Sequence, residues 1–154
     1  MGYAAIDMGE TSELRLPADR AYVVVAKRAA AALGSVSGFD LEAIDDLTIA
    51  VAQAFENAIG CLERAGSLAG QVRLVFKADA KGLHVVVRST MSREAELAAR
   101  ERVRQLALRR EQEINATATD LALKLMGLFV DDSSYRLDER TGGLRVRLTK
   151  YRAS

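Results

Sequence analysis

The chain has 154 residues, of which 49% are hydrophobic and 28% charged, a composition that predicts one folded domain and excludes a disordered chain. Its 22 Lys and Arg residues against 21 Asp and Glu leave a net charge of +1, too small to hold the whole protein on nucleic acid or an anionic membrane. A single cysteine, Cys61, excludes an intrachain disulfide framework, and a single histidine, His84, excludes a His/Cys metal cluster.

The first residues and the apolar stretches of the chain indicate in which cellular compartment the protein is expected. Residues 1–8 lack the basic flank and long apolar run of a signal peptide. No apolar stretch reaches the roughly 20 residues that a membrane-spanning helix needs. We therefore expect a cytoplasmic protein without membrane contact, in which residues 1–12 form an N-terminal extension and residues 13–152 a single domain.

The first half of the domain predicts one strand and two helices. Glu13 to Leu16 alternates polar and apolar residues, as a short strand does. Asp19 can cap a helix from Arg20 to Leu33, and Asp40 can cap a long helix from Leu41 to Ala65. The apolar stripe of the long helix, expected to pack on a sheet, consists of Ile44, Leu47, Val51, Phe55, Ala58 and Leu62.

The second half predicts two hairpins. The first joins strands Gln71 to Ala78 and Leu83 to Ser89, and the second joins Ser134 to Leu137 and Leu144 to Tyr151. In the strand from Leu83 to Ser89, positions 85–87 are apolar on both faces, which indicates a central place in the sheet.

Helical sequence lies between the hairpins. Ser92 to Glu113 is charged and helix-prone, with Glu96 and Arg100 spaced for an i,i+4 pair. A second segment, Ala118 to Val130, carries three leucines on one helical face, Leu121, Leu125 and Leu128. Paired strands with segregated helices predict an α+β two-layer sandwich, in which helices cover one face of a mixed, mostly antiparallel sheet.

Residues 45–58, DDLTIAVAQAFENA, resemble the second helix of the anti-sigma-factor serine kinases, a family of the GHKL ATPase superfamily. In that family an acidic pair, an apolar run and a terminal Asn-Ala form the N box. Residues 125–132, LMGLFVDD, are similar to the helix end after its second glycine box, and residues 148–150 to its last strand. The order of elements agrees over nearly the whole chain. The resemblance implies the Bergerat, or histidine-kinase-like, ATPase fold.

The resemblance assigns Gln53 and Asn57 to the reaction centre of an ATP site. The family has a catalytic Glu at position 53, whereas a Gln carboxamide cannot take a proton at neutral pH. Asn57 remains a candidate Mg²⁺ ligand on the same helical face. In the alternative interpretation, both are polar residues satisfied at the end of a core helix. Cys61, where the family often has His, is interpreted as a buried packing residue.

The nucleotide-binding positions of the family are also changed. Ser89 stands in place of the Asp that accepts from adenine, and Met91 in place of the first glycine. Asp120 and Ala122 occupy the phosphate loop, where a negative side chain would repel a triphosphate and Cβ atoms would crowd it. The sequence therefore predicts a pseudokinase without a bound cofactor. If the site still functions, ATP and Mg²⁺ would bind around Asn57 and these positions.

Three functions remain as hypotheses. The first is a regulatory protein that binds a sigma factor, an anti-anti-sigma (STAS-domain) protein or both without phosphorylation, with the homodimer that the resemblance implies. The alternative is an active ATP-dependent Ser/Thr protein kinase of the same partner-switching family. The third, a nucleic-acid module, draws on basic residues in the strands, but the neutral charge and only 5% aromatic residues argue against it.

Overall fold

The computed structural model describes residues 10–66, 70–106, 120–138 and 141–152. Its elements are β1 (Glu10–Pro17), η1 (Arg20–Tyr22), α2 (Val23–Val36), α3 (Leu41–Arg64), β2 (Gln71–Ala78), β3 (Gly82–Thr90), α4 (Arg93–Leu106), η2 (Gly127–Phe129), β4 (Asp132–Leu137) and β5 (Leu144–Tyr151). A short α-helix at residues 120–126 runs directly into η2.

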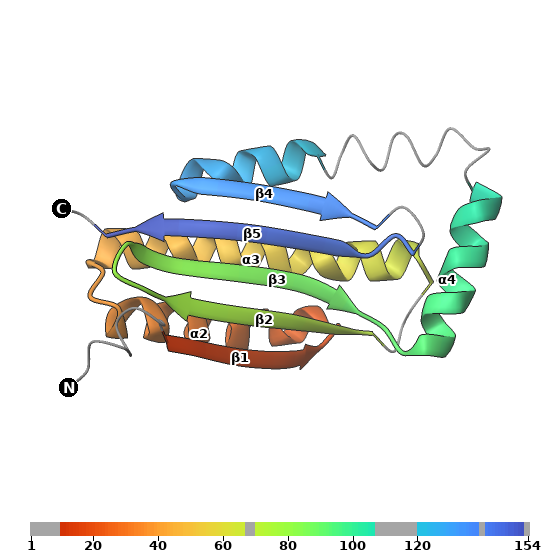
Figure 1. The fold of residues 1–154 in the computed structure, drawn as a ribbon, viewed down its shortest axis with the longest axis horizontal. Helices are drawn as coiled ribbons and strands as arrows, with labels where there is room; N and C mark the ends of the chain where they lie inside the picture. The colour runs from red at the N-terminus through yellow and green to blue at the C-terminus, as the bar shows by residue number, and fades with distance from the viewer. Residues whose placement is uncertain (1–9, 67–69, 107–119, 139–140, 153–154) are drawn as a thin grey trace.

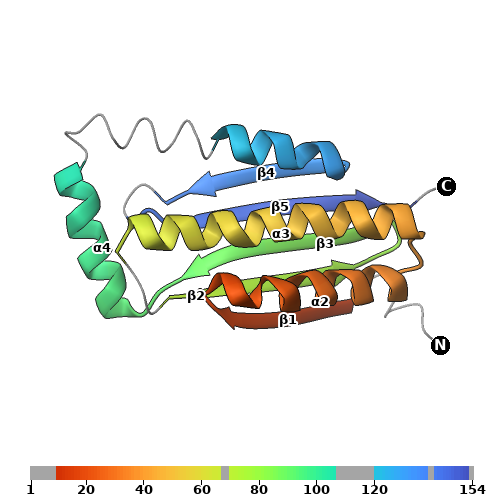
Figure 2. The ribbon, with the colours of Figure 1, turned by 180° about the vertical axis from the view of Figure 1, so that it is seen from behind.

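The strands described form a five-stranded sheet in the order β1-β2-β3-β5-β4. Every pairing between them is antiparallel, so the sheet is not mixed as the sequence had allowed. Helices α2 and α3 lie side by side on one face, seen from the front in Figure 2, and Figure 1 looks onto the opposite, uncovered face. This is the predicted α+β two-layer sandwich, and β3 holds the predicted central position.

Helix α3 fills the middle of the helical layer. The Asp40 carboxylate accepts a hydrogen bond from the backbone nitrogen of Ala43 at 2.8 Å, which caps the helix where the sequence predicts. Of its predicted stripe, Ile44 is half-buried, and the residues that are fully buried are Leu47, Val51, Phe55, Ala58 and Leu62. The core therefore lies between α3 and the central strands.

The hairpin of β2 and β3 is closed by an acidic turn residue. The Asp79 carboxylate accepts from the backbone nitrogens of Lys81 at 2.8 Å and Gly82 at 3.1 Å. Its other oxygen lies 2.8 Å from Nε2 of His84 in β3. The pKa of Asp79 is lowered because these hydrogen bonds outweigh the raising effect of burial.

Some boundaries and faces differ from the sequence prediction. Strand β1 begins at Glu10, three residues before the predicted start. The first predicted helix opens as the 3-10 turn η1, where Asp19 accepts from the nitrogen of Ala21 at 2.9 Å, and α2 runs on to Val36. In the last helical segment the three leucines of the predicted face are exposed, because the residues that pack on the core are instead Leu123, Met126 and Val130.

Helix α4 stands at one end of the sandwich (Figure 1) and keeps the predicted pair of Glu96 and Arg100, whose side chains lie 2.7 Å apart. The remainder of the predicted helix to Glu113, with the beginning of the next one, lies outside the described residues. None of the helices described has the length and apolarity to cross a membrane.

Candidate functional site

Gln53 and Asn57 lie one turn apart on α3, as their spacing predicts. Gln53 is exposed and Asn57 half-buried. The Nδ2 atom of Asn57 donates to the backbone carbonyl of Gln53 at 2.8 Å, so the amide nitrogen is held by its own helix. In the described part of the chain its oxygen accepts no hydrogen bond. Asn57 thus keeps one oxygen that could bind a cation, whereas Gln53 supplies no base.

Ser89 is a buried bridge between three elements. The residue is 8% exposed. Its hydroxyl donates to the backbone carbonyl of Ala58 in α3 at 3.0 Å. The same oxygen accepts from the backbone nitrogen of Leu144 in β5 at 3.3 Å. Both hydrogen-bonding roles of the hydroxyl are therefore used within the protein. The side chain predicted to stand at the adenine-recognition position thus links α3, β3 and β5.

The turn before β5 closes over the same end of the sheet. Met91 is half-buried and packs against the core. A Cβ atom added at Gly143 would lie 3.9 Å from Cε of Met91 and 4.0 Å from Cβ of Ser89. The hydroxyl of Thr141, a residue only 4% exposed, accepts from the nitrogen of Gly143 at 3.2 Å. Side chains and a turn thus pack together at the positions that the sequence predicts for the nucleotide.

Asp120 connects its helix to β4. One carboxylate oxygen accepts from the Tyr135 hydroxyl, and the other lies 2.9 Å from Nζ of Lys124. These hydrogen bonds, that of Tyr135 first, lower the pKa of Asp120, and the same carboxylate raises the pKa of Tyr135. The neighbouring Ala122 is half-buried. Asp120, which the sequence places in the phosphate loop, is therefore an anion that ties its helix to β4.

In the described part of the chain the hydrogen bonds of the predicted site residues Ser89 and Asp120 form two separate groups, one around each residue. Among the described residues, no hydrogen bond or ion pair joins Asp120 to Asn57 or Ser89. A shallow depression of about 230 Å³ does lie beside Asp120, between its helix and β4, and contains none of the N-box residues. It is lined by Leu123, Lys124, Met126, Ser133, Ser134 and Tyr135.

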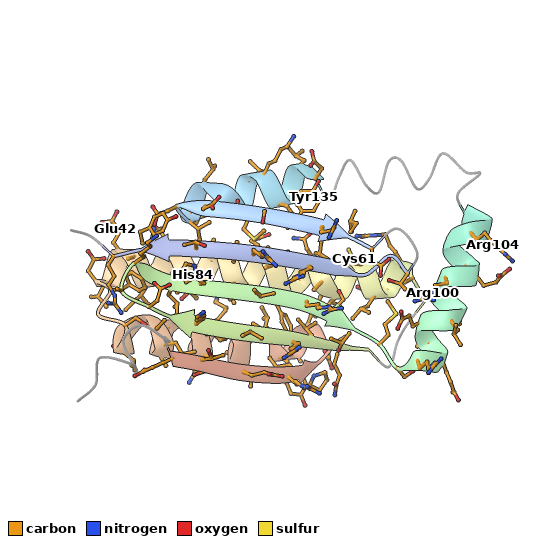
Figure 3. All side chains as sticks on the ribbon, viewed as in Figure 1. Glu42, Cys61, His84, Arg100, Arg104 and Tyr135 are labelled. Carbon is orange, nitrogen blue, oxygen red and sulfur yellow. The ribbon has the colours of Figure 1, made fainter. Side chains whose placement is uncertain are left out.

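Sequence reasoning missed Tyr135 as the partner of Asp120. The side chain is labelled in Figure 3 on β4, beneath the last helix. The only signal was its place between Ser134 and Arg136 in an alternating strand, which shows that it faces the helical layer but not what it contacts.

Cys61 is a packing residue, as predicted. It is 2% exposed, and Nη2 of Arg64 lies 3.2 Å from its sulfur. Burial raises the pKa of the thiol despite that cation. The neutral thiol is a weak nucleophile, so the position adds no chemistry to the site.

These residues do not fit a magnesium nucleotide. No group of three or more His, Cys, Asp or Glu residues that could hold a metal occurs in the described part of the chain. The donor set offers the oxygen of Asn57, but it has no proton-accepting base at Gln53, no carboxylate at Ser89 and no glycine at Asp120.

Comparison with known proteins assigns the fold. The sequence pattern of the histidine kinase-like ATPase domain matches residues 16–150, and such domains in general bind ATP with Mg²⁺. A search of curated proteins gave no match. The match runs from the last two residues of β1 to Lys150 in β5 and includes α2, α3 and the strands β2, β3 and β4. The chain therefore belongs to the histidine kinase-like ATPase domain family.

Proposed function

We propose that this chain is a regulatory binding protein of the anti-sigma type. It binds a sigma factor, a STAS-domain anti-anti-sigma protein or both, and phosphorylates neither. The observation that carries the loss of kinase activity is the buried hydroxyl of Ser89, which is engaged by Ala58 and Leu144. The likeness of residues 45–58 to the N box supports the choice of partner class. A sigma-factor partner would also require a cytoplasmic location.

The alternative function is an active ATP-dependent Ser/Thr protein kinase of the same kind. Asn57 favours it, because its oxygen is still available to Mg²⁺. Against it stand Gln53, which cannot take the proton of a substrate hydroxyl, and Asp120, whose charge repels a triphosphate. Because several positions of the predicted ATP site differ from the family pattern, we favour the binding protein over the kinase.

Nucleotide titration separates the two functions. Isothermal calorimetry with ATP and Mg²⁺ should show no saturable binding to the wild type up to about 1 mM, a bound of roughly −4 kcal/mol. The variant Gln53→Glu restores the base alone and should give the same result, because Ser89 and Asp120 are unchanged. Micromolar binding by the wild type, or phosphorylation of a STAS-domain protein by either form, would establish the kinase instead.

Partner binding is tested by co-expression with sigma factors and STAS-domain proteins of the host. We expect a complex with at least one of them that survives treatment with apyrase, which removes ATP. No phosphorylated species should appear on a phosphate-affinity gel. If purified members of both classes fail to bind, the proposed partner class is wrong.

The proposal includes a homodimer formed through the first strand and helix. Strand β1 is an edge strand, and three large apolar residues of η1 and α2, which follow it in the chain, are partly exposed, namely Tyr22 at 40%, Val24 at 47% and Val25 at 38%. Light scattering should give twice the chain mass for the wild type and the monomer mass for Val24→Asp. Val36→Asp, on an exposed residue at the far end of α2, is the control that should remain dimeric. A monomeric wild type would exclude the dimer.

A further inference from the structure

The uncovered face of the sheet carries an arginine on every strand at the same level. Arg15 pairs with Arg73, Arg73 with Arg88, Arg88 with Arg145, and Arg145 with Arg136. Residues on either side of each arginine in β2, β3 and β5 are buried under the helices, so these arginines point to the other face. We call these five residues the arginine row.

The row crosses the strands at right angles. Neighbouring strands are about 4.8 Å apart, so five strands place the arginines along roughly 19 Å. Figures 1 and 2 show α2 and α3 on the opposite face, and Figure 3 shows the side chains of the uncovered one. The charge of the chain is nearly balanced, so the row is a local concentration of positive charge.

One end of the row already binds a carboxylate. Glu13 of β1 accepts from Nε of Arg73 at 2.8 Å and from its Nη2 at 2.9 Å, and also from Nε of Arg15 at 3.0 Å. These hydrogen bonds lower the pKa of Glu13 to about 2. The row thus demonstrates bidentate recognition of a carboxylate by arginine.

The other end has no such partner. In the described part of the chain, no carboxylate lies within ion-pair distance of Arg88, Arg136 or Arg145, or of Arg147 one step along β5. Nε of Arg145 is buried and makes no hydrogen bond to any described residue. Like charges opposite one another in a sheet are destabilising. The positive charge of this half of the row is therefore uncompensated. The backbone pairing of the strands keeps these arginines next to one another despite their repulsion.

Two valines adjoin the row. Val75 pairs with Val86 in the next outward-facing level, flanked by Glu13 on β1 and Arg147 on β5. Both valines are half-buried. The surface therefore combines a line of cations with a parallel apolar strip.

We propose that this face binds an acidic amphipathic α-helix of a partner protein, lying across the strands with its carboxylates on Arg88, Arg145 and Arg136 and its apolar edge on Val75 and Val86. Carboxylates at alternating i+3 and i+4 positions of a helix advance by about 5.3 Å, close to the strand spacing. A helix about 10 Å wide covers both levels of the face. This surface lies opposite α3, so the proposal does not depend on nucleotide or on sigma-factor binding.

The apolar strip favours a protein over a nucleic acid. A phosphate backbone gains nothing from Val75 and Val86, and neither level contains an aromatic residue on which a base could stack. Lys150 lies on the helical side, where it donates to the carbonyl of Phe129 at 3.3 Å, so the basic residues of β5 do not form one continuous phosphate track.

The probe is a designed helical peptide with Glu at i, i+4, i+7 and i+11 and Leu along the adjacent edge, measured by fluorescence anisotropy. We expect saturable, salt-sensitive binding to the wild type and at least tenfold weaker binding to Arg88→Gln/Arg136→Gln. The matched control, Lys27→Gln/Arg28→Gln, removes the same charge from exposed residues of α2 and should leave the affinity within about twofold.

Four outcomes would overturn the proposal. They are no saturable binding of the peptide by the wild type, equal losses in the two double variants, equal binding of a peptide with the same composition in scrambled order, and tighter binding of a DNA or RNA oligonucleotide than of the peptide. Circular dichroism and thermal melting of both variants show whether each is folded, so lost binding can be assigned to the surface.

Discussion

The hydroxyl of Ser89 donates to the backbone carbonyl of Ala58 at 3.0 Å, and this contact ties the central strand to the end of the N-box helix. The position that the sequence predicts for adenine recognition is part of the internal hydrogen bonding of the domain. The contact links the proposed loss of nucleotide binding to the stability of the fold, and both can be measured.

Ser89→Ala should lower the free energy of unfolding by about 1 to 2 kcal/mol, because it leaves the carbonyl of Ala58 and the nitrogen of Leu144 without their partner in a buried place. Urea denaturation measures the change. Ser134→Ala on exposed β4 is the control, and it should stay within about 0.5 kcal/mol. Equal effects of the two substitutions would refute the bridging role.

Glu13→Gln should remove a pH-dependent part of the stability. The ordinary pKa of 4.5 falls to about 2 in the folded protein because of the hydrogen bonds from Arg73 and Arg15. Since the folded pKa is the lower one, ionised Glu13 stabilises the fold above pH 4.5, and this contribution is lost as the pH falls towards 2. The melting temperatures of variant and wild type should differ at pH 7 and converge near pH 2. A constant difference would contradict the pairing.

Asp120→Asn should lower the pKa of Tyr135 towards its ordinary value of 10.0, because the carboxylate is the main cause of its increase. NMR of tyrosine labelled at Cζ can follow this residue separately from the other three tyrosines of the chain. Asp132→Asn, at an exposed position of β4, should leave the titration unchanged. If the pKa of Tyr135 does not move, Asp120 is not its partner in solution.

Arg145→Gln should raise the free energy of unfolding by about 0.2 to 1 kcal/mol, because it relieves repulsion between cross-strand like charges. Burial, followed by the charges of Arg147, Arg88 and Arg136, lowers the pKa of the Arg145 guanidinium. Urea denaturation without added anions measures the gain, and Arg28→Gln on α2 serves as the neutral control. A destabilised variant would show that this side chain contributes more by packing than it costs by repulsion.

The sequence predicts α3 well because its evidence is local. The Asp40 cap and the stripe that ends at Leu62 both lie within the helix itself, and the hairpin of β2 and β3 is equally short-range. The bridge from Ser89 to Ala58 crosses 31 positions and the contact from Tyr135 to Asp120 joins two elements, so no spacing rule identifies them.

The arginine row was beyond prediction for a related reason. Arg73 and Arg145 each appear in the sequence as basic residues of an alternating strand, but their common level depends on the register of β3 against β5. That register is set by packing of the buried faces across strands distant in the chain. Alternation along one strand predicts on which face of the sheet a side chain lies. It does not predict which residues of the neighbouring strands lie beside that side chain.

The turn at Asp79 has a consequence for the order in which the sheet assembles. Pairs between β2 and β3 join residues at most 19 positions apart (71 and 90), whereas pairs of β1 with β2 span at least 54 (17 and 71) and pairs of β3 with β5 at least 57 (88 and 145). Loop closure favours the two local hairpins, β2 with β3 and β4 with β5, in the folding transition state, and the pairings of β1 with β2 and of β3 with β5 form later. The positive face is then completed only in the last steps, so a nascent or partly unfolded chain would not present it to an acidic partner.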